Sequence, residues 1–402
     1  IPAMQAGHSY TFNLVVGKNR IEVASVTVQD WATGEILAGG QAVEAPSVTE
    51  VTTFSELQTA LSAGKNVKLM NDIVCTAEIS ISNGALTIDG NGKELSTSSE
   101  IRAFRVVSPA TVAFKNLTLT GFVSSAGPAI NNFGTIVLDG CTISNCHVNN
   151  NNGGGAIESS GKLYAINTTF SGNYSGEIGG AINNYGGSLY MSGCTFTNNY
   201  TTKSNAYYGG AIGINDGSEV RLINCSFSGN KYGTNTGTSD IGVFYKPENY
   251  TIAGCTGATI ASNNVDITTN TTGTATLDYS DLSNISFTYT ITVTWNNNDI
   301  TGTGHGTSFT KDGVTITAGD IDFEYKNFMH DGTISTTLGN FTKIEVTADD
   351  IHEFSGTGWS GSNKKQTWTG TPASSVSFSG SIMGMVPYSG NINFVFTIEP
   401  TN

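Results

Sequence analysis

The tetrapeptide Gly-Gly-Ala-Ile at residues 154–157 returns at residues 179–182 and 209–212, and a related Gly-Pro-Ala-Ile occupies residues 127–130. From alanine to alanine the steps are 27, 25 and 30 residues (Ala129, Ala156, Ala181, Ala211). A second motif, Phe-x-x-Asn, follows the last three copies, and a degenerate Ile143-x-x-Cys146 follows the first. Two linked motifs that recur together identify a structural repeat.

The length of this repeat selects the architecture. It is shorter than the ~40–45 residues of a propeller blade, and it lacks the hydrophobic periodicity of helical repeats. The Leu-x-x-Leu-x-Leu-x-x-Asn pattern of leucine-rich repeats is also absent. One coil of a parallel β-helix fits, because three short strands and three turns fill this length and each coil pairs with the next at ~4.8 Å. We predict an all-β chain with a right-handed parallel β-helix of about seven coils.

Stacked coils would place the equivalent residues of successive repeats directly above one another, in columns. The predicted inward columns are a bulky column (Ile143, Phe170, Phe196, Phe227), a small column (Cys141, Thr168, Cys194, Cys225, Cys255) and a corner asparagine column (Asn173, Asn199, Asn230). Each asparagine is expected to bond turn backbone and the asparagine of the next coil. The paired glycines are expected to supply positive φ or close backbone approach. Disulfides between neighbours such as Cys225 and Cys255 remain an alternative, so the cysteines do not settle the redox compartment.

Three segments are predicted along the chain: a β-hairpin segment over 1–46, the β-helix over 47–266, and a C-terminal antiparallel β-sandwich over 267–402. Alternation in residues 10–16 and 21–23 predicts the hairpin, and residues 26–31 close that segment. Residues 53–61 form an amphipathic pattern that predicts a helix covering the open end of the solenoid. Alternating strands such as 285–295 and 392–398 predict the sandwich.

The composition excludes several classes of partner. The 402 residues carry 18 basic and 32 acidic side chains, a net charge of −14. Nucleic acid and anionic membrane surfaces favour a basic face, so neither is expected as a partner. No apolar run approaches the ~20 residues of a membrane-spanning helix, and no signal peptide is evident. Because the chain opens at Ile1, we expect a processed or trimmed product.

The paired Gly-Gly-Ala-Ile and Phe-x-x-Asn repeat, over about residues 110 to 235, resembles that of the chlamydial polymorphic outer-membrane proteins. Related repeats occur in adhesin-like surface proteins of gut bacteria. This resemblance implies a cell-surface β-helical passenger with adhesive roles. The segment that ends near Trp31 is similar to the last strands of fimbrillin-like domains from Bacteroidetes. The alternative is a β extension that packs on the predicted helix cap. The resemblances imply a protein that is secreted or exposed on the outer membrane.

Catalysis on an acidic glycan needs carboxylates paired as acid and base, or held on Ca²⁺ beside a basic residue. In the repeat alignment the acids share no column. Glu158 aligns with Asn131, Asn183 and Gly213, Asp139 with Lys115, Ile166, Ser192 and Ile223, and Asp216 with Gly134, Gly161 and Gly186. We therefore expect no catalytic residue, metal or cofactor. A polysaccharide lyase or glycoside hydrolase is the alternative. Asp320, Asp322 and Glu324 alternate and are expected on one solvated strand face, with Ca²⁺ binding as the alternative there.

A last column lies just past the corner asparagines: His147, Tyr174, Tyr200 and Lys231. If each asparagine points inward, its successor points outward, which predicts an exposed polar-aromatic stripe bordered by Tyr185, Tyr207 and Tyr208. Tyrosine faces suit a glycan or an extended protein segment. The alternative is that these rings only shield the corner from water. The predicted function is a non-catalytic adhesin-like protein whose partner is a host or microbial glycan or a surface protein, acting as a monomer or within a pilus.

Overall fold

The computed structural model describes residues 8–17, 20–30, 48–148, 153–216, 219–233, 237–245, 247, 249–262, 271–384 and 391–400. The chain forms two compact units, Ile1–Ser47 and Val48–Asn402. The first contains the predicted hairpin: β1 (His8–Gly17) pairs antiparallel with β2 (Arg20–Asp30). Residues 18–19 in its turn and Trp31, which the prediction includes, lie outside the described residues, as does the predicted boundary between residues 266 and 267.

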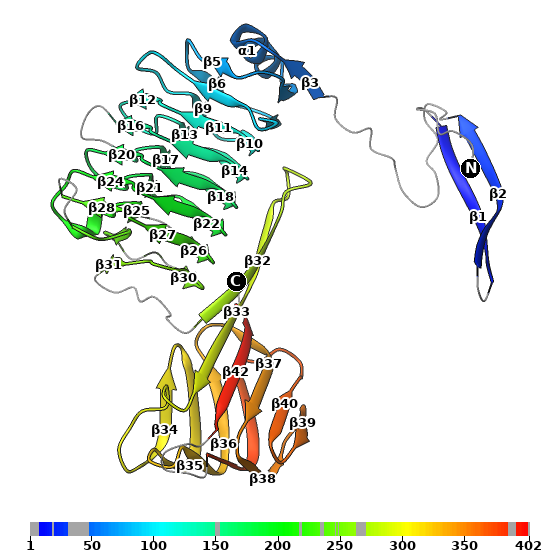
Figure 1. Cartoon of the computed structure of the whole chain (residues 1–402), viewed down its shortest axis with the longest axis vertical. Coiled ribbons are helices and arrows are strands. Elements are labelled where there is room, and N and C mark those ends of the chain that lie inside the picture. Colours follow the sequence, from blue (N-terminus) through cyan, green and yellow to red (C-terminus); the bar gives the residue numbers. More distant parts are fainter. Residues whose placement is uncertain are drawn as a thin grey trace. The chain divides into compact units, whose positions relative to one another are not determined.

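The second unit begins with the predicted parallel β-helix, a solenoid whose coils feed four parallel sheets in turn (Figure 1). Sheet I contains β3 (Val48–Val51), β4 (Asn66–Leu69), β7 (Ala85–Asp89), β10 (Thr111–Lys115), β14 (Thr135–Asp139), β18 (Lys162–Ile166), β22 (Ser188–Ser192), β26 (Glu219–Ile223) and β30 (Asn249–Ala253). Sheet II contains β5 (Ile73–Val74), β8 (Glu94–Ser96), β11 (Thr118–Thr120), β15 (Thr142–Ser144), β19 (Thr169–Ser171), β23 (Thr195–Thr197) and β27 (Ser226–Ser228).

Sheets III and IV complete the solenoid, and sheet III lies between sheets II and IV only in the five coils that begin with β10, β14, β18, β22 and β26. Sheet III contains β12 (Val123–Ser124), β16 (His147–Val148), β20 (Tyr174–Ser175), β24 (Tyr200–Thr201) and β28 (Lys231–Tyr232). Sheet IV contains β6 (Ile79–Ile81), β9 (Phe104–Val106), β13 (Ile130–Asn132), β17 (Ile157–Ser159), β21 (Ile182–Tyr185), β25 (Ile212–Asp216), β29 (Ile241–Val243) and β31 (Ile260–Ser262). One short 3-10 helix, η1 (Ala206–Tyr208), precedes β25.

The predicted helix caps the solenoid. It is α1 (Phe54–Ser62), and it buries Leu57 and Leu61 against the first coils. Thr53 caps its N-terminus: the Glu56 N–H donates to Thr53 Oγ1 at 3.3 Å, and the Glu56 carboxylate accepts from the Thr53 N–H at 3.2 Å. This reciprocal pair satisfies two backbone donors that a helix start would otherwise leave free.

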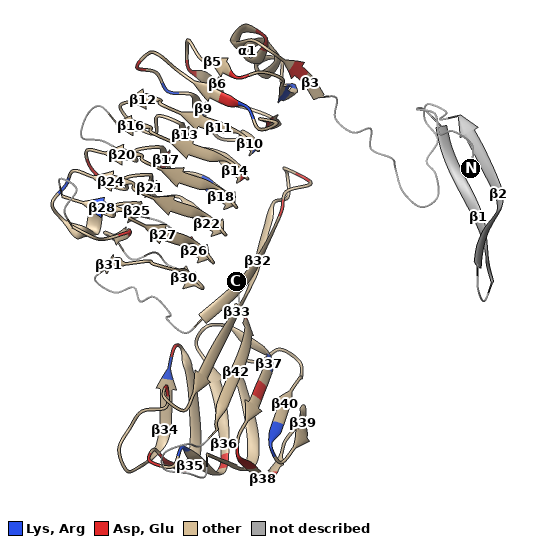
Figure 2. Cartoon of the chain, in the orientation of Figure 1, with Lys and Arg blue, Asp and Glu red and all other residues tan. Residues whose placement is uncertain are grey.

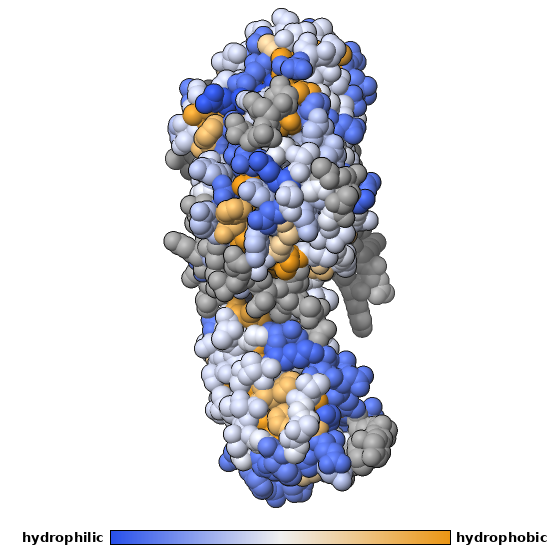
Figure 3. Space-filling model, turned by 90° about the vertical axis from the view of Figure 1, so that its left-hand side faces the viewer, coloured by the Kyte–Doolittle hydropathy of each residue, from blue (hydrophilic) through white to orange (hydrophobic). Residues whose placement is uncertain are grey.

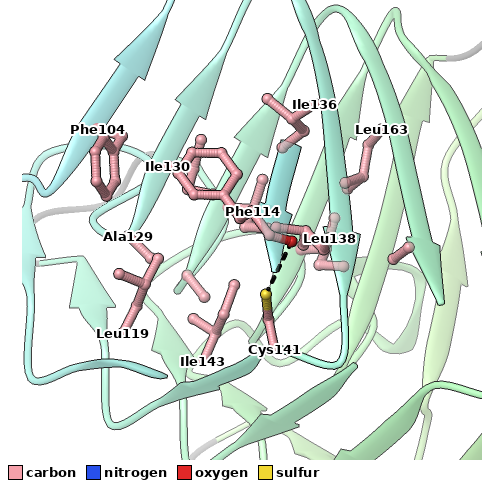
Figure 4. Close-up of a cluster of buried hydrophobic side chains, with 14 of the residues drawn as sticks. Phe104, Phe114, Leu119, Ala129, Ile130, Ile136, Leu138, Cys141, Ile143 and Leu163 are labelled. Atoms are coloured by element: carbon pink, nitrogen blue, oxygen red, sulfur yellow. Dashed lines mark hydrogen bonds between the residues drawn. The ribbon is translucent and has the colours of Figure 1, made fainter. Parts of the chain in front are cut away.

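The solenoid interior contains the predicted columns. Phe170, Phe196 and Phe227 pair in register, and their rings stack at 4.9 and 5.0 Å. Figure 4 shows side chains from sheets I, II and IV converging on this interior, with the Cys141 thiol pointing at the Phe114 carbonyl oxygen, 3.3 Å away. All six cysteines lie among the described residues and are free thiols, so the disulfide alternative is wrong.

The corner asparagines form a continuous hydrogen-bonded row. The Nδ2 of Asn173 donates to Oδ1 of Asn199 at 3.0 Å, and the Nδ2 of Asn199 donates to Oδ1 of Asn230 at 3.0 Å. Each Nδ2 also donates to a backbone oxygen of the preceding coil, at 2.9 to 3.0 Å. The inward-facing prediction is confirmed, and these amides satisfy turn backbone that water cannot reach.

A long hairpin at the start of the sandwich reaches back onto the solenoid. It consists of β32 (Thr271–Asp278) and β33 (Ser286–Asn296). Only residues 291–296 of β33 pair with the sandwich strand β42 (Asn393–Glu399), so residues 274–290 project from the sandwich as an arm (Figure 1). The arm packs on the outer face of sheet I, where Ala113, Val137 and Tyr164 are buried beneath Leu277, Tyr279, Leu282, Ile285 and Phe287.

Polar contacts fix the arm in place. The Tyr279 hydroxyl donates to the Asp139 carboxylate, and the Lys115 Nζ lies 4.6 Å from the centre of the Tyr279 ring. Nearer the sandwich, the Tyr289 hydroxyl lies 3.0 Å from Thr251 Oγ1. The alignment of Asp139 with Lys115 is confirmed by the strand register. Sheet I is therefore closed to a ligand along the length of the arm.

The remaining strands form the predicted antiparallel sandwich. One sheet runs β32, β33, β42, β37 (Asn340–Thr347), β40 (Lys365–Trp368) and β39 (Trp359–Ser362). The other runs β34 (His305–Lys311), β35 (Val314–Asp322), β36 (Asn327–Thr336), β41 (Ser375–Met383) and β38 (Asp350–Ser355). Trp295 is fully buried between them, with its ring edge-on to Phe309 at 5.2 Å. Glu324 lies in the turn after β35, so the prediction that it shares a strand face with Asp320 and Asp322 is wrong.

Candidate binding face

The paired glycines close off sheet IV. A Cβ on Gly180 would lie 2.0 Å from the Gly210 carbonyl oxygen, and one on Gly213 would lie 2.0 Å from Ile178 Cγ2. The loops that lead into sheet IV thus fold over its outer face, with backbone touching backbone. The close approach predicted for Gly-Gly is confirmed. With sheet I under the arm and sheet IV under these loops, sheets II and III keep partly exposed outer side chains.

Sheet III carries the predicted stripe, which we call the aromatic ladder: His147, Tyr174, Tyr200 and Lys231. These residues pair in register from coil to coil. The His147 and Tyr174 rings stack at 4.7 Å and 7°, and the Tyr174 and Tyr200 rings stack at 5.0 Å and 11°. Each side chain is partly exposed. The structure therefore brings together these four predicted residues.

The stacking changes what the aromatic ladder can offer. A ligand was expected to pack against the faces of the tyrosine rings, but the rings of His147 and Tyr200 cover both faces of Tyr174. Only ring edges and hydroxyl groups are left for a partner. Partial burial, followed by the neighbouring Tyr200, raises the pKa of Tyr174, so its hydroxyl stays protonated and able to donate.

Sheet II adds two hydroxyl ladders that the sequence analysis did not single out. One ladder is Thr118, Thr142, Thr169, Thr195 and Ser226, and the other is Thr120, Ser144, Ser171, Thr197 and Ser228. They lie on either side of the buried bulky column. The sequence pattern that could have predicted them is the alternation Thr-Phe-Ser or Thr-Phe-Thr within each repeat. Neighbouring hydroxyls bond to each other, as Ser144 Oγ does to Thr120 Oγ1 at 3.0 Å.

Together these ladders form a weakly polar surface, which we call the open face: the aromatic ladder and the two hydroxyl ladders. Figure 2 shows only scattered charges along the solenoid strands. Figure 3 shows the side that bears sheet III as a mixture of weakly polar and hydrophilic residues with separate hydrophobic spots. Such a surface can exchange hydrogen bonds with a polar partner along several coils.

Tyr207 and Tyr208 come from a different element than the aromatic ladder, but that element adjoins it, since a Cβ on Gly210 would lie 2.4 Å from the Lys231 backbone nitrogen. Both belong to η1, in the loop that covers sheet IV. A Cβ on Gly242 would lie 2.2 Å from the Tyr207 carbonyl oxygen, and the Tyr208 ring lies 5.3 Å from the Phe244 ring. That these two rings border the aromatic ladder stays a prediction.

Carboxylates meet at two places that the alignment missed. On sheet I, Asp89 and Asp139 flank Lys115 in register, next to the hydroxyl of Tyr279. On sheet IV, Glu158 lies near enough to Glu177 for their charges to interact. Glu158 pairs in register with Asn131 and Asn183, as the alignment predicted. The Asp216 alignment is wrong, because a bulge after Asn184 pairs Asp216 with Tyr185.

A cavity of about 570 Å³ lies in the sandwich, lined mainly by glycine, serine and threonine next to Trp368. None of its lining residues is ionisable: Gly356, Thr357, Trp368, Gly370, Thr371, Ser375, Val376, Ser377, Phe378 and Ser379. Across the described residues, three or more His, Cys, Asp and Glu side chains never gather as metal ligands. In the same part of the chain, no helix has the length and apolar character needed to cross a membrane.

Comparisons with known proteins assign no family to this chain. No family model matches the chain, and no curated protein does. Among solved structures, the enzymatically active domain of tailspike protein 4 from bacteriophage CBA120 aligns with 86% of this chain and 66% of its own, slightly under two thirds of its length. The identity is 13% and the TM-score 0.18.

Proposed function

We propose that this chain is a non-catalytic, secreted or cell-surface adhesin-like protein that binds a glycan through the open face of its solenoid. The observation that carries the proposal is the repetition of one polar surface over successive coils. The aromatic ladder repeats at 4.7 to 5.0 Å between ring centres, and the two hydroxyl ladders follow the same coils. A polymer with many hydroxyl groups can use such a surface through many weak, equivalent contacts.

The resemblance of the repeat to that of the chlamydial polymorphic outer-membrane proteins supports the same role. An extended segment of a surface protein is the second occupant that the open face would suit, since it too presents regularly spaced polar groups.

A glycan array tests the proposal. The wild type should bind a defined set of glycans, and the paired variant Tyr174→Ser/Tyr200→Ser should lose at least tenfold in affinity. Tyr325→Ser is the matched control, because Tyr325 is 39% exposed but lies in the sandwich, in the turn after β35. If the paired variant binds as well as the wild type, the open face is not the binding surface. Binding only to a surface protein would replace the glycan with the second occupant.

A polysaccharide lyase or glycoside hydrolase acting on an acidic glycan is the alternative function. Its support is the pair Glu158 and Glu177. Burial raises the pKa of Glu158, as a general acid requires, and a like charge nearby acts in the same direction. Assays for new reducing ends and for unsaturated products on acidic glycans decide between the two functions. Turnover that disappears in Glu158→Gln would favour the enzyme.

A further inference from the structure

The outer face of sheet IV holds three oxygen-bearing side chains in register. Asn131, Glu158 and Asn183 come from β13, β17 and β21, and each pairs with the next. Their chain neighbours Ile130, Ile157 and Ile182 point into the core, so these three side chains point outward. Parallel strands lie ~4.8 Å apart, which places the three side-chain ends next to one another.

The loops over sheet IV cover much of the Glu158 carboxylate, although the side chain stays partly exposed. The Gly154 N–H donates to Oε2 at 2.9 Å, and Asn183 Nδ2 donates to both carboxylate oxygens at 3.0 and 3.2 Å. A Cβ on Gly153 would lie 2.7 Å from Oε2. Two residues thus hydrogen-bond this carboxylate, and the backbone of a third lies close to it.

The charge of Glu158 is not balanced by a cation. Among the residues that the structure describes, no Lys, Arg or His nitrogen lies within 4.0 Å of it. The charged group that acts on it is Glu177, another carboxylate. Enclosed carboxylates are normally paired with a basic side chain or bound to a metal ion.

Two amide oxygens beside this carboxylate also lack a partner. Asn131 is 7% exposed and Asn183 is 4% exposed, and the buried Oδ1 atoms of both find no hydrogen-bond partner among the residues that the structure describes. A buried oxygen without a hydrogen-bond partner lowers the stability of the folded state, so such oxygens usually contact a water molecule or an ion. A 180° turn of the Asn183 amide would exchange its NH₂ for Oδ1 at the carboxylate without changing its volume.

We propose that Asn131, Glu158 and Asn183 form a Ca²⁺ site on sheet IV. Glu158 supplies two oxygens and the two amides supply one each. Water completes the six to eight oxygens that Ca²⁺ takes, and Glu177 adds favourable charge. An all-oxygen set with only one or two carboxylates and a flexible geometry suits Ca²⁺ better than Zn²⁺. The bound ion would fix the loops that cover sheet IV. This inference does not depend on what the open face binds.

Calorimetric titration of the full chain with CaCl₂ tests the site directly. The wild type should bind a Ca²⁺ ion that Glu158→Gln does not bind, and Ca²⁺ should raise the wild-type melting temperature by about 2 °C or more over its value in EDTA. Glu50→Gln removes the same charge from an exposed position on β3, outside both candidate Ca²⁺ sites, and should keep both responses. Asn131→Ala serves as a second variant if Glu158→Gln fails to fold, and it should weaken Ca²⁺ binding at least tenfold.

Two results would overturn the site. One is a wild type that neither binds Ca²⁺ nor gains stability from it, which would mean that a proton neutralises Glu158 instead. The other is a Ca²⁺ response that persists unchanged in both Glu158→Gln and Asn131→Ala, which would place the ion elsewhere.

Discussion

Replacing Asn199 with alanine should destabilise the solenoid more than changing either neighbour. Asn199 Oδ1 accepts from the Asn173 N–H and from Asn173 Nδ2, each at 3.0 Å, while its own Nδ2 donates to the Phe170 carbonyl oxygen at 3.0 Å. The substitution leaves the buried Asn173 N–H without its acceptor, and it also removes the Asn173 Nδ2 bond and one donor from the Phe170 carbonyl oxygen. An unpaired buried group costs about 1–3 kcal/mol and two further hydrogen bonds are lost, so we expect a loss of about 3 kcal/mol.

The two residues beside Asn199 provide matched controls. Tyr200 points outward and is partly exposed, so Tyr200→Ala removes surface contacts and should cost about 1 kcal/mol. Asn198 is exposed and has a φ of 55°, a conformation that glycine adopts freely, so Asn198→Gly should stay within about 0.5 kcal/mol of the wild type.

Urea denaturation followed by circular dichroism measures all three variants. The expected order of destabilisation is Asn199→Ala, then Tyr200→Ala, then Asn198→Gly. If Asn199→Ala lost less than Tyr200→Ala, the asparagine row would not be satisfying buried backbone, and the account of the corner would be wrong.

Three further predictions concern the glycines, the thiols and the arm. Gly180→Ala should prevent folding or strongly destabilise the chain, because its Cβ would lie 2.0 Å from a backbone oxygen. The control Gly186→Ala meets no atom within 4 Å, so it should lower the free energy of unfolding by only the ~1 kcal/mol that a φ of 80° costs a residue with a Cβ. Urea denaturation measures both variants. Burial raises the pKa of Cys141 and Cys146 to about 12, so at pH 8 their thiolate fractions are very small and a thiol reagent should label them only after unfolding; rapid labelling of the native chain would contradict their burial. Tyr279→Phe keeps the ring but removes the hydroxyl that bonds Asp139, so amide hydrogen exchange over residues 274–290 should accelerate, and unchanged exchange would show that this bond does not hold the arm.

Much of the solenoid can be predicted from sequence because its period places equivalent residues in register. The phenylalanine and asparagine columns are found by alignment alone, and their contacts follow from the coil spacing. The alignment fails where a strand gains a residue, as the bulge before Tyr185 shows with Asp216. It also cannot follow a loop that leaves its own strand column, such as η1 with Tyr207 and Tyr208, which covers sheet IV.

The sequence contains an indication that the outer face of sheet I is covered. The outward positions of β10 and β14 are Ala113 and Val137, which are apolar and fully buried. Apolar residues on both faces of a strand indicate that both faces are covered. What covers them could not be predicted, because the arm begins more than 130 residues after Val137 in the chain. The repeat alignment also places the proposed Ca²⁺ ligands Asn131, Glu158 and Asn183 in one column. A search for paired carboxylates passes over this column, because only one of its three members is an acid.

Hydroxyl-radical footprinting of the tyrosines, followed by mass spectrometry, tests most directly which sides of the solenoid are accessible. The open face should react, so Tyr174 and Tyr200 should be oxidised rapidly in the native chain. Tyr164 and Tyr289 are 6% and 9% exposed between sheet I and the arm, and they should be oxidised slowly until the protein unfolds. Equal rates for the two pairs would contradict the account, because sheet I would then be as accessible as the face to which we assign binding.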